Sequence, residues 1–171
     1  MTIGAVMPHN GFRESAERNF NDLDTDGDGF LTRYDYMALA QRRLGQTGVR
    51  ADTPEGESVV DAFLNAWDIH ARALDTDRDG RISKEEYVSS FETLVRTGTL
   101  DTVLTPISRA TFAAADRDRD GWITAEEFGA VWNRPRTDLT TAFARADADR
   151  DGRISFEEFA RARHDLLIGD D

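Results

Sequence analysis

One twelve-residue pattern occurs four times in this chain, and it constrains the fold more than any other feature. Each copy has aspartate at its first, third and fifth positions, glycine at the sixth, an aliphatic residue at the eighth, serine or threonine at the ninth and an acid at the twelfth. Because a recurring pattern indicates one structural unit used several times, we expect four equivalent loops. The copies are DTDGDGFLTRYD over 24–35, DTDRDGRISKEE over 75–86, DRDRDGWITAEE over 116–127 and DADRDGRISFEE over 147–158.

The acids recur at the spacing that a hard metal cation requires. Three carboxylates on alternate residues of a curling backbone point at one centre, the seventh residue offers its carbonyl, and the twelfth closes the cage with both carboxylate oxygens. Calcium takes six to eight such oxygens at about 2.3–2.6 Å. We therefore predict up to four bound Ca²⁺ ions. The predicted ligands, at loop positions 1, 3, 5, 7, 9 and 12, are Asp24, Asp26, Asp28, Phe30, Thr32 and Asp35; Asp75, Asp77, Asp79, Arg81, Ser83 and Glu86; Asp116, Asp118, Asp120, Trp122, Thr124 and Glu127; and Asp147, Asp149, Asp151, Arg153, Ser155 and Glu158.

The first copy allows a second register, which the residue types exclude. A loop that started at Asp22 would still have acids at positions 3 and 5 and glycine at position 6. It would, however, put Gly29 at position 8 and Arg33 at position 12. Because a cationic side chain cannot close a calcium cage, we start the first loop at Asp24.

The first loop ends on Asp35, whereas the other three end on glutamate. Aspartate is one methylene shorter, so both of its oxygens reach the ion only if the loop contracts. One outcome is that this loop binds calcium most weakly or holds Mg²⁺ at rest, since six-coordinate magnesium accepts a one-oxygen ligand and shorter bonds. The other outcome is that the exit helix shifts inward and calcium binds there as well. The sequence leaves both open.

Apolar residues flank every loop at helical spacing, so each loop is expected between two helices. The aliphatic residues at position 8 are expected to form short antiparallel bridges between paired loops. We therefore predict an all-α fold of four helix–loop–helix units in two pairs, 1–96 and 97–171, packed into one compact domain. The predicted helices cover about 11–23, 33–44, 57–74, 84–96, 106–115, 125–133, 138–146 and 156–167.

The segment between the two pairs contains Gly98 and Pro106. Both residues disfavour a continuous helix, and Thr105 before the proline has the character of an N-cap. We expect a helix to begin at Pro106 and the two pairs to fold back onto each other, instead of standing apart on a rigid central helix.

The four loops resemble those of the EF-hand superfamily. The long gap between the first two loops, the helix break between the halves and the ending FARARHDLLIGD are similar to the sarcoplasmic calcium-binding proteins and their calerythrin-like bacterial relatives. This resemblance implies a compact single-domain fold and calcium binding with Mg²⁺ as a competitor. Members often have a degenerate second loop, whereas the second loop of this chain has a complete set of acids.

The composition narrows the functional class. The formal net charge is −12, and sixteen of the 33 acidic residues lie at the predicted ligand positions, so the acidity belongs to the metal sites and argues against nucleic acid as a partner. The chain has no cysteine, no nucleophile–base pair and no phosphate-binding glycine loop, so we expect no enzyme. The start MTIGAVMPHNGF lacks a signal-peptide pattern, and we expect a cytoplasmic protein without a membrane anchor.

Two roles are compatible with calcium binding. A sensor exposes an apolar, usually methionine-rich groove to a helix of a target protein. Here only Met37 of three methionines follows a loop, and the apolar residues around the loops are aromatic, which suits a core that stays closed. We therefore favour an intracellular calcium buffer or storage protein, with a sensor that regulates a partner protein as the alternative. At position 7, the Trp122 indole is expected to pack against the neighbouring hand.

Overall fold

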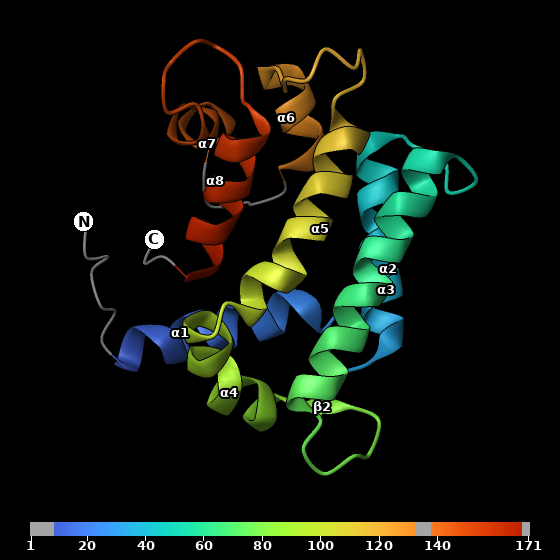
Figure 1. The fold of residues 1–171 in the computed structure, drawn as a ribbon, viewed down its shortest axis with the longest axis vertical. Coiled ribbons are helices and arrows are strands. Elements are labelled where there is room, and N and C mark those ends of the chain that lie inside the picture. Colours follow the sequence, from blue (N-terminus) through green and yellow to red (C-terminus); the bar gives the residue numbers. More distant parts are fainter. Residues whose placement is uncertain (1–8, 133–137, 169–171) are drawn as a thin grey trace.

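Eight helices and two short strands form the part of the chain that the computed structural model describes, residues 9–132 and 138–168. The all-α class and the four helix–loop–helix units are confirmed (Figure 1). In chain order the elements are α1 (His9–Leu23), β1 (Phe30–Leu31), α2 (Arg33–Thr47), α3 (Pro54–Leu74), β2 (Ile82–Ser83), α4 (Lys84–Arg96), α5 (Thr99–Ala115), α6 (Ala125–Val131), α7 (Leu139–Ala146) and α8 (Phe156–Ile168).

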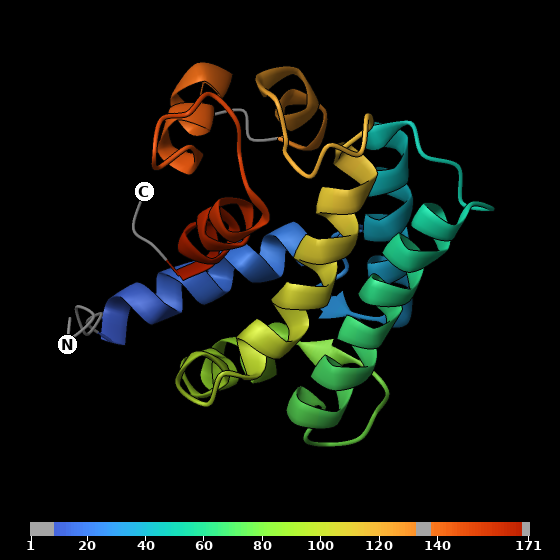
Figure 2. The same cartoon turned by 45° about the horizontal axis from the view of Figure 1, so that its top comes forward.

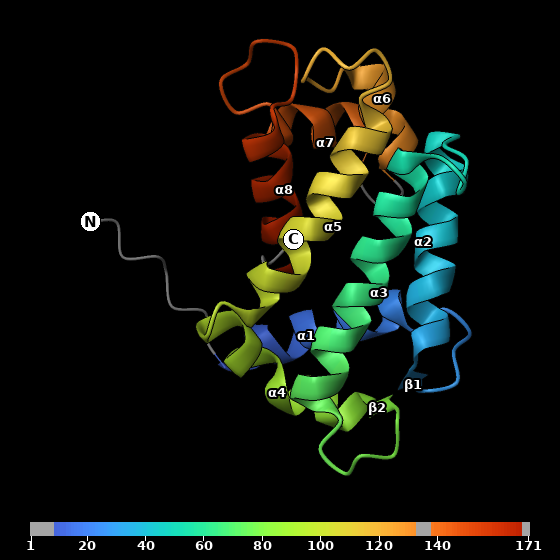
Figure 3. The same ribbon diagram turned by 45° about the vertical axis from the view of Figure 1, so that its right-hand side comes forward.

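The loops pair through their eighth residues, as the pattern predicts. Strands β1 and β2 are antiparallel, with Leu31 opposite Ile82 (Figure 3). In the second pair, Ile123 and Ile154 form an isolated antiparallel bridge whose two N–H···O bonds are both 2.9 Å long. All four side chains are fully buried, so each bridge also anchors its loops to the apolar interior.

Helix α5 connects two clusters of buried side chains. The first cluster is built on α1 to α5 and the second on the end of α5 with α6 to α8. Val103 and Ile107 of α5 belong to the first cluster, whereas Phe112 and Ala115, further along the same helix, belong to the second. The helix runs diagonally between α3 and α8 (Figure 1). The two hand pairs therefore share a structural element.

Contacts between the pairs show that the chain folds back on itself. The Asn19 side chain of α1 donates to the Leu167 carbonyl of α8 at 3.0 Å, and Figure 2 shows these two helices side by side. The Arg43 guanidinium of α2 donates to the Val131 carbonyl of α6 at 2.7 Å. The expected compact arrangement is confirmed.

In the described part of the chain, no helix combines the length and the apolar character needed to cross a membrane.

The predicted start of α5 at Pro106 is wrong, as is the N-cap role of Thr105. The helix begins at Thr99, directly after Gly98 with φ 73°, and continues through Pro106. A proline inside a helix removes one hydrogen bond and crowds the preceding turn. Here Val103 and Ile107, on either side of the proline, are both buried in the first core cluster, and this packing outweighs the local preference. Of the two residues expected to break a helix here, only Gly98 lies at a break, which separates α4 from α5.

Smaller differences concern helix ends. Helix α3 begins at Pro54, three residues earlier than predicted, because Thr53 caps it through its side chain and proline is favoured at the first helical position. Helices α1, α2 and α8 are also longer than predicted by one to three residues at one end. Helix α6 ends at Val131, and the predicted end at 133 lies outside the described residues.

Gly56 should be irreplaceable at the start of α3. A Cβ atom there would lie 2.0 Å from the Arg50 carbonyl oxygen, which is backbone and cannot move away cheaply. We expect Gly56→Ala to lower the free energy of unfolding by about 3 kcal/mol in a denaturant titration of the calcium-loaded protein. Gly45→Ala is the matched control, because nothing lies within 4 Å of its added Cβ inside α2, and it should raise stability by about 0.5–1 kcal/mol. Equal effects would contradict the proposed clash.

Candidate metal centres

Each loop brings three of its predicted ligands to one point. In all four loops, the carboxylates at positions 1, 3 and 12 offer one oxygen each, and these oxygens lie within 4.8 Å of one another. Position 1 directly follows the last residue of the entering helix, position 3 lies in the turn after it, and position 12 lies in the first turn of the exit helix. The clusters are Asp24, Asp26 and Asp35; Asp75, Asp77 and Glu86; Asp116, Asp118 and Glu127; and Asp147, Asp149 and Glu158.

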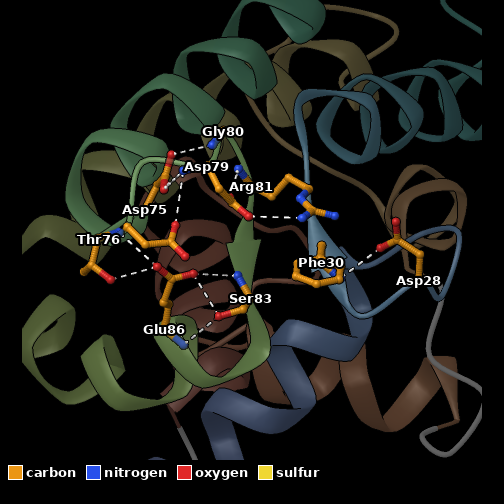
Figure 4. Close-up of polar contacts among 10 residues, drawn as sticks. Asp28, Phe30, Asp75, Thr76, Asp79, Gly80, Arg81, Ser83 and Glu86 are labelled. Atoms are coloured by element: carbon orange, nitrogen blue, oxygen red, sulfur yellow. Dashed lines mark hydrogen bonds and ion pairs between the residues drawn. The ribbon is translucent and has the colours of Figure 1, made fainter.

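The fifth-position aspartates lie outside these clusters. Each accepts a hydrogen bond from the backbone N–H two residues later, as Asp79 does from Arg81 at 2.8 Å. In the second and fourth loops the arginine at position 7 also pairs with this aspartate, at 3.1 Å for Arg81–Asp79 and 3.6 Å for Arg153–Asp151. Figure 4 shows the second loop with these contacts. The position-5 side chains thus stabilise the turn in this structure.

Backbone donors hold the first carboxylate of every loop. The position-6 glycine, with φ between 85° and 87°, donates its N–H to one oxygen of the position-1 aspartate at 3.0 Å. This bond is possible because glycine adopts the left-handed conformation without a Cβ penalty. It orients the position-1 carboxylate within the loop.

The position-4 residues also adopt the left-handed backbone conformation, which the twelve-residue pattern did not predict. Arg78, Arg119 and Arg150 have φ values of 61°, 59° and 62°, whereas the first loop has Gly27 there with φ 73°. A left-handed arginine costs roughly 1–2 kcal/mol relative to its normal backbone conformation. Gly27 was the sequence feature that could have predicted this conformation, because glycine at position 4 of one loop indicates that all four loops need a positive φ there.

The side chain of the twelfth residue ties the exit helix to the start of the loop, and it also forms part of the N-terminal cap of that helix. In the second loop, Glu86 Oε1 accepts from the Thr76 N–H at 2.9 Å and its hydroxyl at 2.8 Å, and Oε2 accepts from the Ser83 N–H and hydroxyl, both at 2.8 Å. The Ser83 bonds form a capping box that begins α4. The backbone hydrogen bond from Ser83 is the main cause that lowers the pKa of Glu86 to about 2. The carboxylate is therefore ionised and oriented without needing an ion to do so.

Asp35 makes the same set of bonds despite its shorter side chain. Its Oδ1 accepts from the Thr25 N–H and hydroxyl, both at 2.9 Å, and its Oδ2 accepts from the Thr32 N–H at 2.8 Å and hydroxyl at 2.9 Å. Burial raises the pKa of Asp35, but these hydrogen bonds outweigh it, and the pKa is lowered. Asp35 is fully buried, whereas Glu86 is half-buried. The shorter side chain thus keeps all four hydrogen bonds, and the calcium affinity of the first loop stays a prediction.

In each pair of loops, the arginine side chain at position 7 of one loop packs on the aromatic ring at position 7 of the other. The Arg81 guanidinium lies 4.2 Å from the centre of the Phe30 ring, and the Arg153 guanidinium lies 4.6 Å from that of the Trp122 ring. The expected packing of Trp122 against the neighbouring hand is confirmed. Such cation–π contacts contribute about 0.5–1 kcal/mol at exposed sites. The alternation of aromatic and arginine at position 7 is visible in the sequence, and it was the missed signal for this contact.

Four acid-lined loops, each between an entering and an exit helix and paired through position 8, define a calcium-binding protein with four EF-hands. The chain belongs to the EF-hand domain pair family, whose sequence model matches residues 13–92 and 105–164. Calcium binding is thus supported, with four candidate loops.

Comparisons with individual proteins agree with this class. Calerythrin from Saccharopolyspora erythraea is 29% identical over 117 residues, which cover 67% of this chain and 66% of calerythrin. The sarcoplasmic calcium-binding protein of Hediste diversicolor is 27% identical over 123 residues, 72% of this chain and 68% of its own. The second of these relatives is a calcium-binding protein by name.

A solved structure extends the similarity over almost the whole chain. A calcium-binding protein from Streptomyces coelicolor superposes with a TM-score of 0.77 at 26% identity, covering 93% of this chain and 99% of the other. That structure is described as the basis of prokaryotic calcium-mediated regulation. The resemblance to calerythrin-like proteins predicted from the sequence is confirmed.

Proposed function

We propose that this protein is an intracellular calcium buffer or store that binds up to four Ca²⁺ ions, two in each hand pair, 1–96 and 97–171. The ligands are the residues at positions 1, 3, 5, 7, 9 and 12 of the four loops. Calcium would draw the position-5 carboxylate and the position-7 carbonyl toward the three carboxylates that already lie together. The observation that carries the buffering role is the closed interior around α5.

The apolar faces of the exit helices are covered in this fold. Tyr36 of α2, Tyr87 of α4, Phe128 of α6 and Phe159 of α8 are all 4% exposed or less. Among the described residues, Tyr34 and Leu139 are the large apolar side chains that are exposed. A sensor would have to separate these buried surfaces on binding calcium, at about 25 cal/mol for each Å² of apolar surface exposed. A buffer binds its ions without that rearrangement.

A calcium-dependent regulator is the second candidate, and the similarity to the Streptomyces coelicolor protein favours it. In this case calcium would open a groove for a helix of a partner protein. The two roles differ in the affinity for calcium and in the surface that calcium exposes.

A calorimetric calcium titration in a magnesium background, combined with chromatography on a phenyl-substituted resin, separates the candidates. The buffer is expected to bind with a Kd of about 10⁻⁹–10⁻⁸ M and to pass through the resin with or without calcium. A regulator would bind at about 10⁻⁷–10⁻⁵ M, and the resin would retain it until a chelator is added. A variant with Asp35→Asn, Glu86→Gln, Glu127→Gln and Glu158→Gln is the control, and it should show neither response.

Asp35→Glu decides between the two outcomes left open for the first loop, which are weak calcium binding with magnesium at rest and calcium binding in a contracted loop. Asp35 already accepts four hydrogen bonds in a fully buried position, so an added methylene must push the exit helix outward and enlarge the cage. We expect this variant to raise the calcium-over-magnesium selectivity of the first loop by about tenfold, equivalent to about 1.4 kcal/mol. Competition titrations monitored by NMR of the Gly29 amide would measure it. Unchanged selectivity would show that the contracted loop already binds calcium.

A further inference from the structure

A cavity of about 590 Å³ lies between the two hand pairs. Side chains of α1 to α6 and of α8 line it, among them Phe63, Leu104, Phe128 and Phe159. Its volume falls in the range of sites for small organic molecules, about 300–1,000 Å³, and such sites combine apolar walls with a few placed polar groups. Of the predicted metal ligands only Asp24 lies on its wall, so metal binding leaves most of this space unused.

Three residues that line this cavity each have one buried polar atom without a hydrogen-bond partner in the described part of the chain: Nε of Arg43, Nε2 of His70 and Nε1 of Trp132. His70 is 3% exposed, and its other ring nitrogen is hydrogen-bonded to the Tyr36 hydroxyl. Buried polar atoms are nearly always paired in native proteins, because an unpaired one costs about 1–3 kcal/mol. The Arg43 and Trp132 atoms are N–H donors in any protonation state, so each of these two donors lacks an acceptor, although carboxylates and amides such as Asp22 and Asn21 lie elsewhere on the cavity wall.

Within the described residues, Arg43 forms no salt bridge with an acidic side chain. Its Nη1 donates to Gln46 Oε1 at 3.1 Å and to the Val131 carbonyl at 2.7 Å, and both acceptors are neutral. Burial, together with the charges of Arg163 and Arg42, lowers the pKa of Arg43 to about 9. At neutral pH the guanidinium therefore remains a cation that is partly withdrawn from water. A desolvated cation with neutral partners is costly, and an anion would offset this cost.

The three observations converge on one kind of ligand. The contact with the Val131 carbonyl places the guanidinium beside the backbone of the next residue, Trp132. The Trp132 ring stacks on Phe128 with centroids 5.2 Å apart. We propose that this cavity binds an aromatic organic anion, with the ring system among the apolar side chains and the acidic group accepting hydrogen bonds from Arg43 and Trp132. This inference does not rest on the buffering role.

Two dyes that differ in one charge test the proposal on the calcium-loaded full chain. 8-Anilinonaphthalene-1-sulfonate is the anion, and N-phenyl-1-naphthylamine is its uncharged analogue. We expect one sulfonate dye per chain, and Arg43→Met should weaken its binding about tenfold or more, the loss of one charge-assisted hydrogen bond. The uncharged dye should change less than about twofold. Arg161→Met removes an exposed arginine of α8 that does not line the cavity, and it should leave both affinities unchanged.

A second variant locates the site independently of charge. Leu104→Trp fills the cavity and should prevent both dyes from binding, while thermal unfolding and calcium stoichiometry check that the variant is folded. Undiminished dye binding to Leu104→Trp, or equal losses of both dyes in Arg43→Met, would overturn the proposal. So would a change of oligomeric state in Arg43→Met without any change in dye affinity, since the cavity would then face a second copy of the chain.

Discussion

Chelating calcium is expected to lower the melting temperature of this protein by about 20 °C or more. In each loop, three carboxylates with oxygens within 4.8 Å of one another repel, and a bound divalent cation replaces that repulsion with attraction. Binding to the folded state alone stabilises it by about 2.7 kcal/mol per site at a calcium concentration of 100 times Kd. Four such sites contribute roughly 11 kcal/mol, and a protein of this size shifts by about 2–4 °C per kcal/mol.

Circular dichroism melts with saturating calcium and with excess chelator would measure this shift. Potassium chloride at matched ionic strength is the control, because surface repulsion in a chain of net charge −12 is also relieved by simple screening. A shift below about 5 °C, or one that potassium chloride reproduces, would show that the carboxylate clusters do not bind calcium strongly.

Glu127→Gln is expected to weaken calcium binding at the third loop by about 100-fold or more. The carboxylate accepts from the Arg117 N–H at 2.9 Å, from the Thr124 N–H at 2.9 Å and from the Thr124 hydroxyl at 2.8 Å. Burial raises its pKa, but the hydrogen bonds from Thr124 and Arg117 outweigh it, and the pKa is lowered. An amide would remove the charge and direct an NH₂ group at backbone donors. Losing one member of a buried charge pair costs about 3 kcal/mol or more, which is more than 100-fold in affinity.

Glu126→Gln is the matched control for this prediction. Glu126 is the preceding residue in the same first turn of α6, but it is exposed and lies outside the carboxylate cluster. Calorimetric titrations should show one class of sites lost in Glu127→Gln and none in Glu126→Gln. The fourth loop should weaken less than the third, because the bridge between Ile123 and Ile154 transmits only part of the change. Equal titrations for the two variants would contradict the ligand role of position 12.

Short-range patterns determined the loops of this protein and most of its helices. Ligand, glycine and cap positions lie within twelve residues of one another, and each acts through hydrogen bonds to backbone nearby, as Ser83 and Glu86 do at the start of α4. The eighth residues pair because they are aliphatic and fully buried in all four loops. Such features can be predicted from the sequence because their physical causes are local.

Only the tertiary structure decided the features that depend on distant partners. Pro106 remains inside α5 because residues around it are buried against other helices, and this packing outweighs its local preference. The contact of Arg43 with the Val131 carbonyl joins positions 88 residues apart, and the cavity beside it exists only once both hand pairs have folded together. Burial and charge compensation are properties of the assembled interior, so no local pattern in the chain encodes them.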